Sequence, residues 1–346
     1  MSEPSDSAGS TVLVTGGSGF LGGRCITSLI DHGHRVRSTI RNLDRAADLR
    51  ASLCPNLDHP SRLEFVEADL AADAGWPAAV AGCDYVLHIA SPFPDHQPKD
   101  PDELIVPARD GALRVIRAAL DAGVKRVVMT SSTAAIRNGD DDTHTGPYTE
   151  ENWTDPDRPG LSPYPRSKTI AERAAWELVD QSGDRDRLAV VNPSAILGPV
   201  QGDEMSFSLQ IIQRMLKGMP GVPELGFGFV DVRDVADLHI RAMTAPAAGG
   251  QRFIASGPFL WLSEVSRILR EGLPEAAAKA PTRKVPKPVV RLMGMFDPGI
   301  RSIVGDIGHR TDYSAAKAET ALGWKARPIE ETIIDCANSL IAKEKT

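Results

Sequence analysis

The sequence predicts an α/β protein in which a doubly wound parallel sheet is joined to a smaller, mostly helical domain. Three observations support this fold class. Short apolar, β-branched runs alternate with helical stretches through the first half of the chain, which is typical of a parallel sheet covered on both faces. A glycine-rich turn follows the first run, and Pro-interrupted, helix-rich sequence follows the last. We therefore expect one sheet domain and one smaller domain.

The expected strands are short runs rich in Val, Ile and Leu, as buried parallel strands are. In chain order they cover residues 11–15, 35–40, 62–66, 85–89, 126–130 and 188–191. Helical periodicity is clearest over residues 107–122 and 164–180. Residues 229–235 and 253–256 are expected to return to the sheet. The sheet domain is thus predicted to span residues 11–193 and about 229–261, and the second domain about 194–228 and 262–346.

The composition agrees with a globular protein of about two domains. The 346 residues are 42% hydrophobic and 25% charged, enough to bury a large core. The net charge of −7 disfavours nucleic acid and anionic membranes as partners. The four cysteines form no Cys-x-x-Cys pair, which favours a reduced, cytoplasmic location. No apolar run is long enough to span a bilayer, and residues 1–10 are expected to form a disordered leader.

The turn after the first strand carries the spacing Gly-x-x-Gly-x-x-Gly, formed by Gly16, Gly19 and Gly22. Glycines at these positions allow a tight turn, the approach of a pyrophosphate to the backbone, and close packing of the next helix. That helix, expected over residues 24–30, offers amide groups and the positive end of its dipole. The pattern predicts a dinucleotide site, and a glycine-rich turn without a ligand is the alternative.

The end of the second strand indicates which dinucleotide is bound. An acidic residue about 20 residues past the glycines holds the ribose 2′-hydroxyl of NAD, whereas an arginine suits the 2′-phosphate of NADP. Arg41 ends this strand, Arg37 and Arg45 flank it, and the first acid, Asp44, comes late. NADP(H) is therefore the predicted cofactor, with solvated surface arginines as the alternative. Asp69, after the third strand, is placed either to contact the adenine or to cap a helix.

Tyr164 and Lys168 lie four residues apart in a predicted helix, so their side chains share one face. A neighbouring ammonium stabilises a phenolate, which helps a tyrosine to exchange protons. Hydroxyl side chains occupy residues 130–133 at the end of the fifth strand, where doubly wound sheets bind ligands. The spacing does not say which hydroxyl faces a substrate. A solvated helix face is the alternative reading of the tyrosine and lysine.

Together these motifs resemble the extended short-chain dehydrogenase/reductases, and within them the dihydroflavonol reductase and aldehyde (carbonyl) reductase branch. The resemblance covers nearly the whole chain after Ser10. It rests on the segments at residues 15–22 (TGGSGFLG), 83–92 (CDYVLHIASP), 164–172 (YPRSKTIAE), 192–199 (NPSAILGP) and 229–236 (FVDVRDVA). The fold that it implies is a Rossmann-type sheet with a smaller substrate domain.

The resemblance also implies roles for individual residues. Ser132, the second serine of its pair, is implied to be the catalytic serine, Tyr164 the proton donor and Lys168 the residue that holds the ribose and stabilises the phenolate. Arg41 resembles the family's 2′-phosphate arginine. No histidine shows metal-ligand spacing. The implied cofactor contacts are Gly16, Gly19, Phe20, Leu21, Gly22, Arg41, Asp69, Leu70, Ala90, Tyr164, Lys168 and Pro193.

The chain departs from the family pattern at two places. Related reductases carry Asn-Gly in the helix before the fifth strand, whereas this chain has Asp110-Gly111, so the resemblance does not extend to an asparagine-organised proton relay. The residues after Tyr164 lack the cysteine and glycine pattern of the acyl-CoA reductases of this branch. Reduction of CoA thioesters is therefore disfavoured.

The activity that the resemblance implies is NADPH-dependent reduction of a small aldehyde or ketone by a monomer or homodimer. A nucleotide-sugar epimerase or dehydratase, a hydroxysteroid-type dehydrogenase and a non-enzymatic NADP(H) sensor are the alternatives. The residues after Ser132 include no acid of the kind that dehydratases use. The missing acid after Ile40 disfavours the tightly bound NAD of epimerases, and sensors often lose the tyrosine or lysine that this chain keeps.

Overall fold

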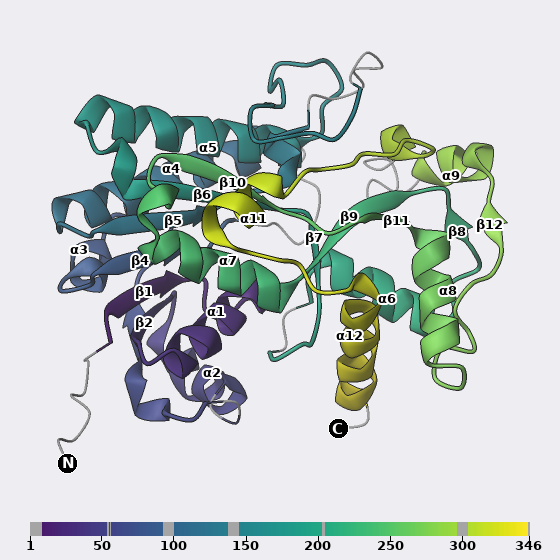
Figure 1. Ribbon diagram of the computed structural model, residues 1–346, viewed down its shortest axis with the longest axis horizontal. Helices are drawn as coiled ribbons and strands as arrows, with labels where there is room; N and C mark the ends of the chain where they lie inside the picture. Colours follow the sequence, from purple (N-terminus) through teal and green to yellow (C-terminus); the bar gives the residue numbers. More distant parts are fainter. Residues whose placement is uncertain are drawn as a thin grey trace.

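A seven-stranded parallel sheet forms the larger part of the molecule (Figure 1). The structure is a computed structural model that describes residues 9–53, 55, 57–92, 100–137, 145–202, 205–295 and 304–344. The predicted leader therefore falls mostly outside the described residues. The strands, in spatial order, are β3 (Leu63–Glu67), β2 (Arg35–Ile40), β1 (Thr11–Thr15), β4 (Tyr85–His88), β5 (Arg126–Thr130), β6 (Leu188–Pro193) and β10 (Gln251–Ala255). Every neighbouring pair is parallel.

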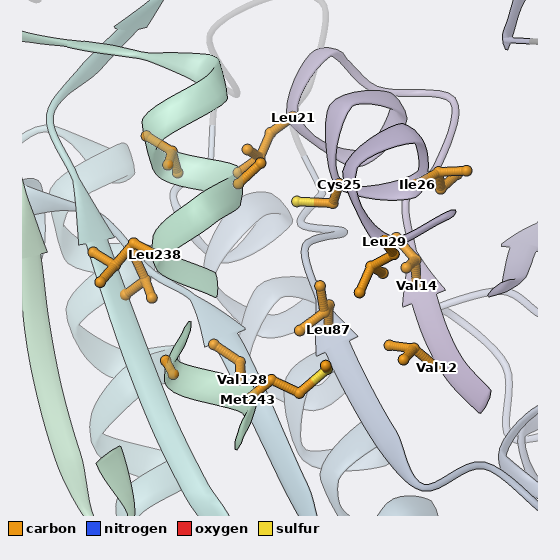
Figure 2. Close-up of a cluster of buried hydrophobic side chains, with 14 of the residues drawn as sticks. Val12, Val14, Leu21, Cys25, Ile26, Leu29, Leu87, Val128, Leu238 and Met243 are labelled. Atoms are coloured by element: carbon orange, nitrogen blue, oxygen red, sulfur yellow. The ribbon is translucent and has the colours of Figure 1, made fainter. Parts of the chain in front are cut away.

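Helices cover both faces of this sheet, because successive residues of a buried strand point to opposite sides. Val12 and Val14 of β1 belong to one core cluster and Leu13 to the other. Figure 2 shows the first cluster, in which Leu29 and Met243 lie over β1, β4 and β5. The first face carries α1 (Phe20–Asp31), α2 (Ala46–Leu53), α7 (Val232–Thr244) and α11 (Ala316–Leu322), and the second carries α3 (Trp76–Val80), α4 (Asp102–Asp121) and α5 (Pro163–Ser182).

The predicted doubly wound fold is thus confirmed. The strand order reverses between β1 and β4, and in such sheets a ligand crevice opens at the carboxyl ends of the strands on either side of the reversal.

Short 3₁₀ helices lie in the connections, namely η1 (Leu43–Arg45), η3 (Pro60–Arg62), η4 (Thr133–Ala135), η5 (Arg185–Arg187), η6 (Pro246–Ala248) and η7 (Val304–Asp306).

The smaller part of the molecule contains two small sheets as well as helices. β7 (Ala195–Leu197), β9 (Gly226–Asp231) and β11 (Phe259–Trp261) form one sheet, and β8 (Val222–Pro223) pairs with β12 (Lys284–Val285). A separate core cluster joins the first of these sheets to α6 (Phe207–Lys217), α8 (Leu262–Gly272) and α12 (Ile329–Lys343). Helix α9 (Lys287–Gly294) directly follows β12 in the sequence.

The prediction that residues 229–235 return to the large sheet is wrong. β9 belongs to the three-stranded sheet, and the chain enters α7 at Val232. The reason is local, because the Asp231 carboxylate accepts the backbone N–H of Arg233 and so caps the new helix. Residues 253–255 do return to the large sheet as part of β10.

Two further details differ from the sequence analysis. Helix α4 begins at Asp102 and contains Pro107 in its second turn, whereas the helical periodicity was clear only from that proline onward. In addition, Ala318 and Leu322 of α11, with Trp324, pack in the core of the large sheet. Part of the segment 262–346 is therefore attached to the sheet domain, and the division into two domains stays a prediction.

Candidate active site

The predicted site residues lie along one edge of the large sheet. The glycine turn follows β1, Arg41 follows β2, and Ala90 lies just after β4. Ser132 comes two residues after β5, and Pro193 ends β6. Because these strands are all parallel, their carboxyl ends share an edge, which is the edge where doubly wound sheets bind ligands.

The turn between β1 and α1 has room for backbone only. Gly16 has a φ of +71°, and a Cβ added to it would lie 3.0 Å from the backbone of Ala90. A Cβ on Gly22 would lie 2.0 Å from the Gly16 carbonyl oxygen. Gly19 caps α1 without any side-chain hydrogen bond, so no capping side chain satisfies the amides of Phe20 and Leu21. This cradle fits the pyrophosphate of a dinucleotide.

Of the three arginines predicted near this site, the structure leaves Arg41 and Arg45 available. Both side chains are exposed, and neither forms an ion pair within the described part of the chain. Arg37 is instead committed to the fold, since it pairs with Glu64 and donates to the carbonyl oxygens of Ala79 and Ala81, at 3.0 and 2.8 Å. The guanidiniums that could meet a 2′-phosphate are therefore those of Arg41 and Arg45, and Arg41 is the one directly after β2.

Asp69 and Leu70 have structural partners of their own. One carboxylate oxygen of Asp69 accepts the N–H of Ala71 at 2.9 Å, so this side chain caps a turn rather than a helix. Leu70 packs against Gly111 of α4, where a Cβ would come within 3.0 Å of it. Asp110 pairs with Arg109, and that hydrogen bond holds the pKa of its carboxyl below the usual range.

Tyr164 and Lys168 lie on the first turns of α5, as predicted. The helix starts with Pro163 in its first turn and ends at Gly183, which adopts the left-handed conformation. The Lys168 ammonium lies 5.9 Å from the centre of the Tyr164 ring. Lys168 is buried, and among the residues that the structure describes no carboxylate pairs with it. A buried ammonium without a counter-ion favours an anionic or strongly polar partner.

Ser132 lies at the start of η4, against which α5 packs. Its hydroxyl oxygen accepts the N–H of Ala134 at 3.1 Å, so the hydroxyl proton remains for donation. The preceding Ser131 is anchored by its backbone N–H to the Val191 carbonyl. The Ser131 hydroxyl is fully buried. Ser132 is thus the serine placed at the edge of the sheet beside α5.

Thr15 and His88, neither of which was predicted as a site residue, organise the backbone around the turn. The Thr15 hydroxyl accepts the N–H groups of Ile89 and Ala90 at 3.1 and 3.0 Å and lies 2.9 Å from His88 Nδ1. Thr15 must therefore donate its proton to Nδ1, so His88 carries its own proton on Nε2. Burial, with the nearby Lys168 ammonium, lowers the pKa of His88 to about 3. Both residues lie within the motif segments at 15–22 and 83–92, and that position is the sequence signal that could have identified them.

Of two cavities in the described part of the molecule, only the smaller lies near the predicted catalytic serine. The larger, of about 940 Å³, lies between α5 and β10 and is lined by Arg173, Glu177 and Lys317, with none of the predicted catalytic residues. The smaller, of about 80 Å³, also contains none of them in its lining, but it is lined by Thr133, next to Ser132, and by Phe227 of β9. We assign the second to the site, because it adjoins the carboxyl edge of the large sheet.

Neither a membrane span nor a metal cluster is found in the described residues. No helix there combines the length and apolar character needed to cross a bilayer. Across the same ranges, no three His, Cys, Asp or Glu side chains converge as metal ligands would.

Comparison with known proteins shows the family. Residues 12–255 match the NAD dependent epimerase/dehydratase family. Tetraketide alpha-pyrone reductase 2 of Arabidopsis thaliana is 36% identical over 272 residues, which cover 77% of this chain and 83% of that protein. Cinnamoyl-CoA reductase CAD2 of Medicago truncatula is 35% identical over 276 residues, covering 78% and 83%.

A solved structure extends the similarity to nearly the whole chain. The yeast methylglyoxal/isovaleraldehyde reductase Gre2, crystallised with NADPH, superposes with a TM-score of 0.80 and 25% identity, covering 97% of this chain and 99% of that one. All three relatives are reductases, in agreement with the predicted branch. The chain therefore belongs to the NAD dependent epimerase/dehydratase family, the extended short-chain dehydrogenase/reductases, and is an oxidoreductase of that family.

Proposed function

We propose that this protein reduces a small aldehyde or ketone with NADP(H) as its cofactor, and that Tyr164 donates the proton. The observation that carries the proposal is the buried Lys168 ammonium beside the Tyr164 ring, which pairs with no carboxylate among the described residues. That ammonium has the position needed to stabilise a phenolate. The NADPH bound in the yeast Gre2 structure supports the choice of cofactor.

The residues that would hold NADP(H) are those of the carboxyl edge. The amides of the glycine turn would bind the pyrophosphate, and Arg41 would bind the 2′-phosphate. Ala90 and Pro193 would line the path of the nicotinamide ribose, and Lys168 would bind the ribose hydroxyls. When bound, NADPH supplies the hydride that reaches the carbonyl carbon.

The chain's own residues would then control the carbonyl oxygen. Ser132 would donate a hydrogen bond to that oxygen, since its hydroxyl oxygen already accepts the Ala134 N–H. Tyr164 would transfer its proton to the same oxygen as negative charge develops there. Lys168 would stabilise the phenolate that remains. Ser132 comes from the end of β5, and Tyr164 and Lys168 come from α5.

The cavity next to Ser132 bears on substrate size. Its volume is about 80 Å³, and Phe227 and Phe259 contribute apolar walls to it. Thr133, Arg137 and Asp306 add polar groups to the same lining. A small cavity with both apolar and polar walls suits a small carbonyl compound. The Cinnamoyl-CoA reductase relative makes a CoA thioester the second candidate substrate, although the residues after Tyr164 lack the pattern of acyl-CoA reductases.

A substrate scan tests this proposal. Loss of NADPH absorbance is measured with a series of aldehydes and ketones, a cinnamoyl-CoA thioester and a sugar nucleotide, at equal concentration. We expect consumption with at least one small aldehyde or ketone. NADPH consumption with the cinnamoyl-CoA thioester alone would identify a CoA thioester, the second candidate, as the substrate. Absence of consumption with every carbonyl, despite NADPH binding, would contradict the proposed reductase.

A further inference from the structure

A fully buried carboxylate lies one helical turn beyond the proposed catalytic lysine. Glu172 of α5 has no exposed side-chain surface, and it follows Lys168 by four residues, as Lys168 follows Tyr164. Residues at this spacing share one face of a helix. The same face of α5 therefore carries the proposed proton donor, the ammonium and this carboxylate.

Glu172 is held by side chains from two strands. Its Oε1 accepts a hydrogen bond from Arg252 Nε of β10 at 2.5 Å, and its Oε2 accepts one from Asn192 Nδ2 of β6 at 2.8 Å. All three side chains are buried. A buried ion pair is seldom more stabilising than apolar residues of the same volume. Stability alone therefore does not account for these polar groups.

Arg252 is itself fixed from the other side. Its guanidinium lies 3.5 Å from the centre of the Trp153 ring, and its Nη1 donates to the carbonyl oxygens of Glu150 and Asn152 at 2.9 and 3.0 Å. The planar guanidinium can turn little with these contacts in place. The carboxylate of Glu172 is thus oriented by a partner that is already rigid.

Asn192 links this ion pair to the proposed catalytic serine. The same Nδ2 that donates to Glu172 also donates to the backbone carbonyl of Ser132, at 3.1 Å. A continuous set of hydrogen bonds therefore runs from α5, through β6, to the backbone that carries the Ser132 hydroxyl. It joins the two separate elements on which the proposed catalytic residues lie.

We propose that Glu172, acting through Asn192, is a positioning residue that holds the Ser132 hydroxyl in register with Tyr164 and Lys168. This inference rests on the proposed function. Both hydroxyl groups must reach one carbonyl oxygen, and a misplacement of about 1 Å can cost about 100-fold in rate. The hydrogen-bonded set restrains the distance between the end of β5 and the active face of α5.

A double-mutant cycle tests this role. Asn192→Ala removes the link to the Ser132 carbonyl and leaves the Glu172–Arg252 pair in place. We expect kcat to fall about 10- to 100-fold, while the dissociation constant of NADPH changes less than about threefold. In a Ser132→Ala background the same substitution should cost less than about threefold, because the serine that it positions is already absent. If Asn192→Ala does not fold, the same double-mutant cycle with Ser132→Ala is measured with Glu172→Gln.

Thr332→Val is the matched control, since its buried hydroxyl donates to Asp231 away from the proposed catalytic residues. This variant should lose thermal stability and keep kcat. An unchanged kcat in Asn192→Ala, or full additivity with Ser132→Ala, would overturn the positioning role. If Ser132→Ala alone kept full activity, the proposed function itself would fail, and the two failures are thus distinguishable.

Discussion

Arg41 is the residue on which the choice between NADPH and NADH depends in this account. Charge-assisted hydrogen bonds of an arginine to a phosphate contribute about 1.5–3 kcal/mol. Arg41→Ala should therefore raise the KM for NADPH about 10- to 100-fold and leave that for NADH nearly unchanged. Steady-state kinetics with both cofactors check this. An equal effect on both cofactors would contradict a 2′-phosphate contact.

Arg37→Ala is the informative comparison for that measurement. Arg37 donates to carbonyl oxygens at 2.8 and 3.0 Å at the carboxyl end of α3, so its loss should lower stability and not cofactor preference. The sequence grouped Arg37, Arg41 and Arg45 together, because their spacing is compatible with one site. Only the fold separates Arg37 from the other two, since its carbonyl partners come from about 40 residues further along the chain.

Some individual residues could be assigned a role from sequence motifs, and others could not. Ser132, Tyr164 and Lys168 could be named from the sequence because their residue types and spacing carry chemistry. Glu172 and Asn192 stood in the same motif segments, yet their role depends on hydrogen bonds between residues 20, 60 and 80 positions apart. Such contacts have no local pattern, which is why the sequence assigned them no function.

At the scale of elements, the β1 turn and α1 act as a unit. A Cβ on Gly22 would meet the Gly16 carbonyl oxygen at 2.0 Å, so α1 would have to move away from the turn. Gly22→Ala should thus weaken NADPH binding at least about tenfold, as the amides of the first turn lose their alignment. Fluorescence titration with NADPH measures this.

Gly305→Ala serves as the control, because a Cβ there meets nothing within 4 Å. This variant should bind NADPH as the unaltered protein does. Equal affinity in Gly22→Ala and Gly305→Ala would show that the turn does not approach the cofactor as proposed.

The large sheet could be predicted element by element, whereas the small sheets could not. β1 and β5 are five-residue strands whose three central residues are apolar, and that length is enough to show their type. β7 and β11 have only three residues each, and β8 and β12 two. A run that short has no readable period, and its pairing is set by neighbours distant in the chain. The wrong assignment of residues 229–235 has only the second cause, because β9 is six residues long but pairs with β7 and β11 before α7 begins at Val232.

At the scale of the whole molecule, two buried histidines make stability depend on pH. The Nδ1–H of His239 donates to the Val235 carbonyl, and because burial keeps the ring neutral, Nε2 accepts from the Thr130 hydroxyl. Burial lowers the pKa of His239 to about 4, and that of His88 to about 3. In the unfolded chain both titrate near 6.5. The stability from these groups is complete above about pH 6.5 and is lost as the pH falls toward 4.

Between pH 7 and pH 5 each histidine should lower the free energy of unfolding by about 2 kcal/mol. Urea unfolding at the two pH values checks this in the unaltered protein and in His239→Gln. The variant should lose about 2 kcal/mol less on acidification, whatever its stability at pH 7. Parallel losses in both proteins would show that His239 does not remain neutral in the fold.

The central claim is that Tyr164 donates the proton in an NADP(H)-dependent carbonyl reduction. Tyr164→Phe tests it most directly, because the ring beside Lys168 is kept and only the hydroxyl is removed. Tyr85→Phe is the matched control, since Tyr85 also packs with a lysine, Lys125, at 5.7 Å from ring centre to ammonium. With the substrate found by the scan, kcat should fall at least about 100-fold in Tyr164→Phe, with NADPH affinity and the control unchanged. A Tyr164→Phe enzyme that keeps more than about a tenth of its activity would contradict the claim.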